Sequence, residues 1–141
     1  MKAIVVFALL AGLAVTSCAR KAAVEGSVDT NSANADSISI KNHQSATVSV
    51  NGAKFKVLLK DVINDSRCPT GVNCVWAGTV FAVLQVEGIG ETIELEIRKP
   101  KTFQLANTTY KAELTAVTPY PEAGKKINPD DYVATVKINR Q

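Results

Sequence analysis

The chain has few of the residues on which common enzymes and metal sites depend. Its 141 residues include one histidine, His43, and one tryptophan, and aromatic residues make up only 6% of the sequence. A Ser-His-Asp triad or a zinc site would have to recruit His43, which falls in a segment that we expect to be disordered. The aspartates match no calcium-loop spacing. We therefore expect no metal and no cofactor, and we find little support for hydrolytic chemistry.

Clusters of basic residues are also missing. Lys and Arg number 16 against 13 Asp and Glu, and the longest basic runs are the pairs Arg20-Lys21 and Lys125-Lys126. Proteins that bind nucleic acid neutralise many phosphates with clustered basic side chains. The sequence therefore predicts that nucleic acid is not a partner.

No apolar run reaches the ~20 residues that a helix needs to span a bilayer. The nearest is residues 3–15, an uncharged apolar stretch that follows Lys2 and precedes Thr16-Ser17-Cys18. A short basic start, an apolar centre and small residues at the end are the parts of a bacterial export signal. We predict that residues 1–17 are a signal peptide, and their layout resembles the lipobox of bacterial lipoproteins.

This resemblance implies that the mature protein begins at Cys18, with a diacylglycerol on its sulfur and a further acyl chain on its amine. One acyl chain holds a protein to a membrane only weakly, whereas two or three make the attachment effectively permanent. An ordinary secretion signal would not explain the cysteine, and an uncleaved membrane helix would need a longer apolar run. We expect a lipid-anchored protein of the bacterial cell envelope. Ala19 is compatible with sorting to the outer membrane, on either its periplasmic or its surface face.

The cysteine count fits an exported protein. The chain contains three cysteines, an odd number that would leave one stray thiol outside the cell. Once Cys18 carries lipid, Cys68 and Cys74 remain as a pair that lies close together in the sequence. Because an oxidising compartment favours their oxidation, we predict a Cys68–Cys74 disulfide.

Composition divides the rest of the chain into two parts. Residues 18–43 are rich in Ser, Asn, Asp and Ala and contain no aromatic residue, so we expect the acylated cysteine to be followed by a disordered tether. Residues 44–141 carry repeated β patterns and are long enough for a single core. We predict one β domain over residues 44–141.

Alternating apolar residues and turn signals predict six to eight strands in this domain, and no segment shows a helical stripe. Asn51-Gly52 suits a tight hairpin turn, and Pro119 and Pro121 should stop the sheet because proline cannot donate to a ladder. The predicted fold is all-β, either a single antiparallel β-sandwich or a partly open barrel. The expected strands cover residues 47–50, 54–62, 75–86, 92–98, 102–105, 109–117 and 132–138.

The densest cluster of unusual residues follows the second expected strand and runs into the start of the third. Residues 67–78 read R-C-P-x4-C-V-W-A-G, a pattern that resembles a group of small exported bacterial proteins, many of them lipoproteins, without an assigned activity. The likeness extends over most of residues 45–138. It implies a β fold and export, and it supplies no catalytic residue.

Two interpretations of this motif remain open. It can be structural reinforcement, with Trp76 packing on the disulfide or capping the core and Arg67 pairing with Asp61 or Asp65. The braced loop can also present a binding surface, since rigid loops on β scaffolds commonly do so. The candidate binding residues are then Arg67, Pro69, Trp76 and Tyr120. A redox role is disfavoured, because thiol-disulfide catalysts place their cysteines as C-x-x-C at the start of a helix.

The functional prediction is a membrane-anchored, non-catalytic binding or structural module of the envelope. Its expected partners are the membrane, through the lipid anchor, and a protein, peptide or glycan held near it. The alternative is a small envelope enzyme or enzyme inhibitor that acts through the disulfide-braced loop.

Overall fold

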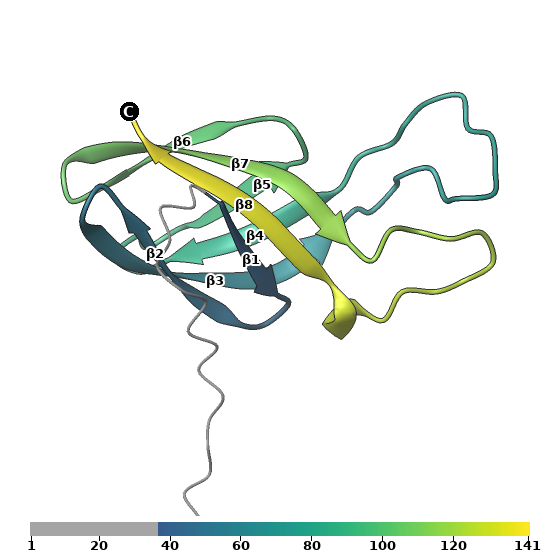
Figure 1. Cartoon of the computed structure of the whole chain (residues 1–141), viewed down its shortest axis with the longest axis horizontal. Helices are drawn as coiled ribbons and strands as arrows, with labels where there is room; N and C mark the ends of the chain where they lie inside the picture. Colours follow the sequence, from purple (N-terminus) through teal and green to yellow (C-terminus); the bar gives the residue numbers. More distant parts are fainter. Residues whose placement is uncertain (1–36) are drawn as a thin grey trace, which may run out of the picture. The chain divides into compact units, whose positions relative to one another are not determined.

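The computed structural model describes residues 37–141, so the predicted signal peptide, Cys18 and most of the predicted tether lie outside the described residues. Two antiparallel sheets of four strands pack face to face (Figure 1). The first sheet has the order β1 (Ser37–Lys41), β8 (Val133–Arg140), β7 (Thr108–Thr118) and β6 (Lys101–Leu105). The second has the order β2 (Ser45–Val50), β3 (Ala53–Ile63), β4 (Phe81–Val86) and β5 (Thr92–Glu96).

The all-β prediction is confirmed, and the structure is a sandwich because the two sheets do not close into a barrel. Each sheet buries one face, as the alternating sequence patterns require. Leu59, Leu84 and Leu95 of the second sheet are almost completely buried, as are Leu114 and Ile138 of the first. Residues 37–141 contain no helix that is long and apolar enough to cross a membrane.

The predicted hairpin between β2 and β3 is confirmed. Asn51 and Gly52 both have positive φ, at 49° and 83°, which is the backbone that a two-residue hairpin turn with the right twist demands. The register then pairs Val50 with Ala53 and Val48 with Phe55. This register places the apolar side chains of both strands on the core face.

The predicted boundary of the domain at residue 44 is wrong. Strand β1 begins at Ser37, inside the predicted tether, and Ile40 is 2% exposed opposite Ala134 of β8. Ser37 to Ile40 alternate in polarity over too few residues to stand out from a polar segment. The strand is stabilised by a partner almost a hundred residues later in the chain.

The predicted long strand over residues 75–86 is also wrong in its first half. Only β4 is extended in a sheet, and the preceding residues form a loop in which Val75 and Trp76 face solvent. Gly78 has a φ of 70°, a left-handed conformation that turns the backbone before β4. The apolar run therefore contains both an exposed loop and a buried strand.

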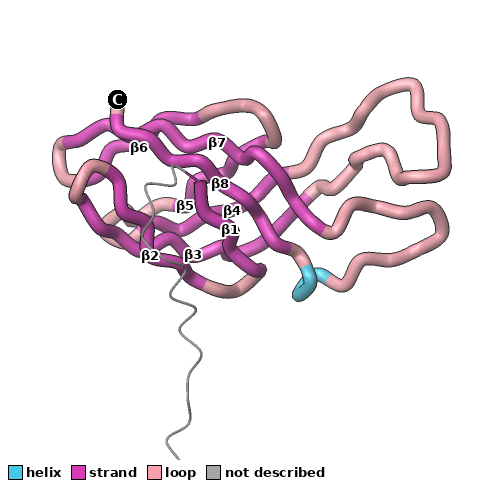
Figure 2. The backbone as a smooth tube through the Cα atoms, in the orientation of Figure 1, coloured by secondary structure: helices cyan, strands magenta, loops and turns pink. Residues whose placement is uncertain are grey.

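Two long loops leave the same end of the sandwich (Figures 1 and 2). The disulfide loop, residues 64–80, joins β3 to β4, and the proline loop, residues 119–132, joins β7 to β8 and contains the 3-10 turn Pro129–Asp131. Both loops lie at this end because β3 and β7 end there and their antiparallel partners, β4 and β8, begin there. We call this side of the molecule the loop end.

Candidate functional site

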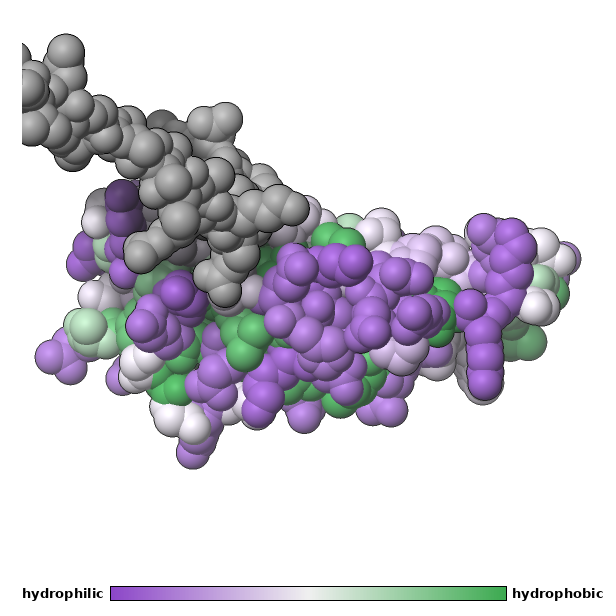
Figure 3. Space-filling view, turned by 90° about the horizontal axis from the view of Figure 1, so that it is seen from below, coloured by the Kyte–Doolittle hydropathy of each residue, from purple (hydrophilic) through white to green (hydrophobic). Residues whose placement is uncertain are grey.

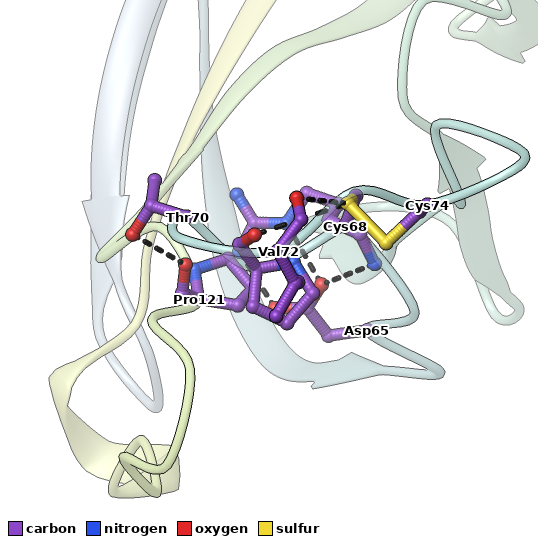
Figure 4. The surroundings of a disulfide bond; sticks show 8 residues. Asp65, Cys68, Thr70, Val72, Cys74 and Pro121 are labelled. Carbon is purple, nitrogen blue, oxygen red and sulfur yellow. Dashed lines mark hydrogen bonds and ion pairs between the residues drawn. A yellow bond between two sulfur atoms is a disulfide. The ribbon is translucent and has the colours of Figure 1, made fainter.

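The two loops of the loop end are bonded to each other. The backbone N–H of Thr70 donates to the carbonyl of Pro121 at 2.9 Å, and the N–H of Ala123 donates back to the Thr70 carbonyl at 3.1 Å. Figure 4 shows Thr70 next to Pro121, with the Thr70 hydroxyl also donating to the Pro121 carbonyl at 3.4 Å. The two backbone bonds form a short parallel bridge between Thr70 and Glu122. The disulfide loop and the proline loop therefore make a single surface.

The disulfide between Cys68 and Cys74 is present as predicted (Figure 4). It closes a small ring within the disulfide loop, while the N–H of Cys68 donates to the carbonyl of Ala77 at 3.1 Å. Closing such a ring removes conformations from the unfolded chain and is worth on the order of 2 kcal/mol. The bond braces the outer half of the loop.

Arg67 holds the inner half of the same loop, and its side chain is buried, with 6% of the residue exposed. Its guanidinium forms a two-pronged pair with Asp65, with Nε donating to Oδ1 at 2.8 Å and Nη2 to Oδ2 at 2.6 Å. The same group donates to the carbonyls of Val117 at 2.5 Å and Pro119 at 3.0 Å. Arg67 thereby fastens the disulfide loop to the start of the proline loop.

Two tyrosines of the proline loop complete this cluster. The hydroxyl of Tyr132 donates to Oδ2 of Asp65 at 3.0 Å. The ring of Tyr120 lies against the guanidinium of Arg67, with 4.9 Å from Cζ to the ring centroid, a cation–π arrangement. We call Asp65, Arg67, Tyr120 and Tyr132 the arginine hub.

The charges in the arginine hub stabilise the contact between the two loops. Burial alone would raise the pKa of Asp65, but the hydrogen bonds and the charge of Arg67, with the hydroxyl of Tyr132, outweigh it and hold that pKa below its usual value. Burial and the bond to Asp65 raise the pKa of Tyr132. At neutral pH the carboxylate is therefore ionised and the phenol is protonated, which is the pairing that the geometry requires.

The lowered pKa of Asp65 predicts a loss of stability in acid. A carboxyl group that is more acidic in the folded state stabilises the fold above its unfolded pKa, and this contribution is lost as pH falls through the folded value. We expect the free energy of unfolding in urea to drop as the pH falls below the ordinary aspartate pKa of about 3.9. The variant Asp65→Asn should be less stable at pH 7 and should show a shallower drop. Equal slopes for the two proteins over this range would contradict the prediction.

The base of the disulfide loop is a tight crossing of two backbone segments. The N–H of Ser66 donates to the carbonyl of Thr79 at 2.8 Å, and the N–H of Thr79 donates to the Ser66 hydroxyl at 3.1 Å. Gly78 lies directly against the Ser66 carbonyl, so closely that an added Cβ would overlap the backbone of Ser66. Glycine at this position allows the crossing.

The tip of the disulfide loop is exposed and apolar, contrary to the expectation that Trp76 packs on the disulfide or the core. Val75 is 95% exposed, Trp76 81% and Val72 48%, and we call these three residues the apolar tip. No charged residue occurs from Cys68 to Val80. On the face shown in Figure 3, the visible described residues are mostly hydrophilic, with separate hydrophobic patches between them.

The remaining candidate residues are Pro69 and Tyr120. Pro69 is half-buried, and Tyr120 is 49% exposed with its ring against Arg67. Tyr120 also lines a pocket of about 170 Å³ in the proline loop, together with Pro119, Lys126 and Ile127. Pockets that enclose small-molecule ligands are usually about 300–1,000 Å³. This one holds a single small group at most.

The described residues show no arrangement typical of a metal site or an acid–base pair. Residues 37–141 contain no group of three or more His, Cys, Asp or Glu that could hold a metal ion. Outside the hub, shifted pKa values belong to exposed ion pairs: Lys99 lowers the pKa of Glu96, and Glu122 raises the pKa of Lys125. These shifts follow from pairing at the surface.

Arg67 and Tyr120 of the hub were candidates from the sequence, whereas the part played by Tyr132 was not predicted. Arg67 was expected to pair with Asp61 or Asp65, and it pairs with Asp65. Asp61 instead accepts the backbone N–H of Val62 at 2.8 Å. The spacing Asp-x-Arg was the available signal for the first partner, whereas Tyr132 gives no local signal of its role.

The sequence matches no protein-family model, and neither a curated protein nor a solved structure is similar to it at a significant level. Inference about function therefore depends on the loop end and on the sequence before residue 37.

Proposed function

We propose that this chain is a lipid-anchored protein of the bacterial envelope whose β domain is a non-catalytic binding module that uses the loop end. The observation that carries the proposal is an exposed Val75-Trp76 pair on a loop that is otherwise locked by a disulfide and by Arg67. Exposed large apolar side chains on an ordered loop typically mark contact sites. A preorganised loop also loses less conformational entropy when it binds.

Two features support the envelope as its location. The sequence before Cys18 has the order of a lipoprotein signal, and acylation of Cys18 accounts for the odd cysteine. The Cys68–Cys74 disulfide is typical of proteins that mature in an oxidising compartment. Ala19 is compatible with anchoring in the outer membrane.

The shape of the loop end favours binding over catalysis. The apolar side chains stand on a projecting loop, and the pocket beside Tyr120 is too small to enclose a substrate of ordinary size. The partner is then a protein, peptide or glycan of the envelope, with Pro69, Trp76 and Tyr120 as its contact residues. Arg67 is buried and holds the two loops together through its hydrogen bonds.

An enzyme inhibitor is the second candidate. A projecting loop braced by a disulfide can enter the cleft of an enzyme, and this geometry favours an inhibitor over an enzyme. A partner that proves to be a hydrolase slowed by the purified domain would establish this variant of the proposal.

The anchor is tested by replacing its acylation site. In cells, Cys18→Ala should move the protein from the membrane pellet to the soluble fraction, because no acyl chain can then be attached. Cys74→Ala serves as the control and should remain in the pellet. An unlipidated protein that stays in washed membranes would contradict the anchor.

The binding surface is tested by truncating its largest exposed side chain. Trp76→Ala should reduce recovery of the partner in pull-downs from solubilised envelopes by about tenfold or more, since an aromatic hot spot is commonly worth 2 kcal/mol or more. Lys54→Ala, at the opposite end of β3, is the matched surface control. Equal recovery with both variants would exclude Trp76 as a contact.

A further inference from the structure

We infer that the apolar tip, Val72, Val75 and Trp76, inserts into the headgroup layer of a membrane and forms a second contact besides the lipid anchor. This inference rests on the proposed function for its membrane, and it names lipid, in place of a protein, peptide or glycan, as what the tip contacts. Pro69 and Tyr120 are then left for another partner, and Trp76→Ala should leave the pull-down of that partner unchanged.

The exposure of the tip is unusual for three neighbouring apolar residues. Val75 and Trp76 have 95% and 81% of their surface in water, and Val72 has 48%. Tryptophan is enriched where membranes meet water, because its ring is apolar and its N–H remains a donor to headgroups and water. Shallow insertion would bury all three side chains and keep the loop backbone at a hydrated depth.

The charge pattern removes the main obstacle to insertion. From Cys68 to Val80 the loop contains no ionisable side chain other than the two disulfide-bonded cysteines. Arg67, just before this stretch, is buried and neutralised by Asp65. Entry into the interface therefore carries no desolvation cost for a charge.

The neighbouring loop offers weak and balanced electrostatics. Lys125 and Lys126 are exposed on the proline loop, but Glu122 pairs with Lys125, and Asp130 and Asp131 lie on the same loop. The two lysines can contact lipid phosphates, but the carboxylates on the same loop offset the net attraction to an anionic membrane. Insertion should therefore depend on apolar contact and only slightly on the charge of the lipid.

The chain length allows the tip and the anchor to meet one membrane. Ser37 pairs with Lys137, four residues beyond Val133, so β1 begins about 13 Å from the loop end of the sheet. Residues 19–36 span at most about 60 Å when fully extended. With Cys18 acylated, a weak contact at the tip becomes effective because its local concentration is high.

A glycan or a protein pocket fits these observations less well. A glycan needs polar partners beside an aromatic platform, and the residues before and after Trp76 in the sequence are Val75 and Ala77. A protein would have to provide a cavity shaped for this convex tip, whereas a lipid interface requires no shape. The protein pocket remains as an outcome of the test.

The test uses the full chain with Cys18→Ala, so that no acyl chain contributes. Trp76 is the only tryptophan, so intrinsic fluorescence reports the tip alone. Vesicles of phosphatidylcholine, and separately of phosphatidylethanolamine with phosphatidylglycerol, should shift its emission to the blue and protect it from iodide. Lipids brominated on their acyl chains should quench it.

Two substitutions separate insertion from other causes. Val75→Asp puts a charge on a residue that packs against little, and it should weaken vesicle partitioning by about tenfold, or 1.4 kcal/mol. Ser49→Asp adds the same charge on β2, away from the loop end, and should change partitioning by less than about twofold. Both variants should keep the wild-type unfolding midpoint.

Three results would overturn the inference. The first is an unchanged Trp76 spectrum with both vesicle types. The second is binding to anionic vesicles only, abolished by about 0.5 M NaCl, where the Debye length is only about 4 Å, and unaffected by Val75→Asp. The third is a blue shift produced by an envelope protein in detergent but not by vesicles. The anchor is tested separately, by whether the Cys18→Ala protein leaves the membrane fraction. The binding module is tested separately as well, by how much protein partner the Trp76→Ala protein recovers in a pull-down.

Discussion

Replacing Arg67 with alanine should lower the free energy of unfolding by about 3–5 kcal/mol, the usual cost of removing one partner of a buried ion pair. The substitution leaves the carboxylate of Asp65 in a buried site with only the Tyr132 hydroxyl as a side-chain partner. It also removes the donors to the carbonyls of Val117 and Pro119. Urea unfolding followed by circular dichroism at pH 7 measures the change.

Arg140→Ala is the matched control for this experiment. Arg140 is exposed at the end of β8, and its truncation should change stability by less than about 0.5 kcal/mol. Asp65→Asn combined with Arg67→Ala should cost less than the sum of the two single substitutions, because they share one interaction. Additive effects would show that the hub is not a cooperative unit.

Replacing Gly78 with alanine should also be strongly destabilising, by about 2 kcal/mol or more. The new Cβ would overlap the Ser66 carbonyl, and a φ of 70° is unfavourable for alanine. The crossing of Ser66 and Thr79 must then separate, so their amide protons should exchange with solvent faster. Hydrogen exchange and urea unfolding measure the local and the global effects.

Gly90→Ala is the control for the glycine. Its Cβ would meet no atom within 4 Å. We expect a change within about 0.5 kcal/mol, typical of a surface substitution. If Gly78→Ala were as mild as Gly90→Ala, the base of the disulfide loop would not be the rigid crossing described above.

Local sequence patterns predicted the parts of the fold that local chemistry determines. Asn51-Gly52 specified the β2–β3 hairpin, because few other residue pairs adopt positive φ at both positions. Ile93 and Leu95 alternate with Thr92 and Glu94 in β5, and the core side and solvent side follow from the two-residue period. The disulfide followed from counting cysteines.

Features that depend on distant residues were not predictable in the same way. β1 carries only two apolar residues, Ile38 and Ile40, and it exists because β8 supplies its hydrogen-bond partners. Val75 and Trp76 have the composition of a buried strand, but the chain turns at Gly78 before β4 and leaves them in water. A hydrophobic sequence pattern does not reveal which apolar residues a fold leaves uncovered.

The candidate site was predicted only in outline, because most of its contacts also join distant parts of the chain. The motif identified the braced loop and Arg67, but the contacts that unite the two loops run from Arg67 to Pro119 and from Thr70 to Pro121. These contacts join segments about 50 residues apart in the sequence. Only the antiparallel topology brings those segments to one end of the sandwich.

Hydroxyl-radical footprinting of Trp76, read by mass spectrometry, tests the central claim that the loop end is exposed on the isolated protein and covered in the envelope. The purified chain with Cys18→Ala and the natural chain in intact cell envelopes would be compared, with Phe103 of β6 as the internal reference. We predict rapid oxidation of Trp76 in the purified chain and oxidation several-fold slower in envelopes, with Phe103 unchanged. Equal oxidation of Trp76 in both samples, or protection already in the purified chain, would contradict it.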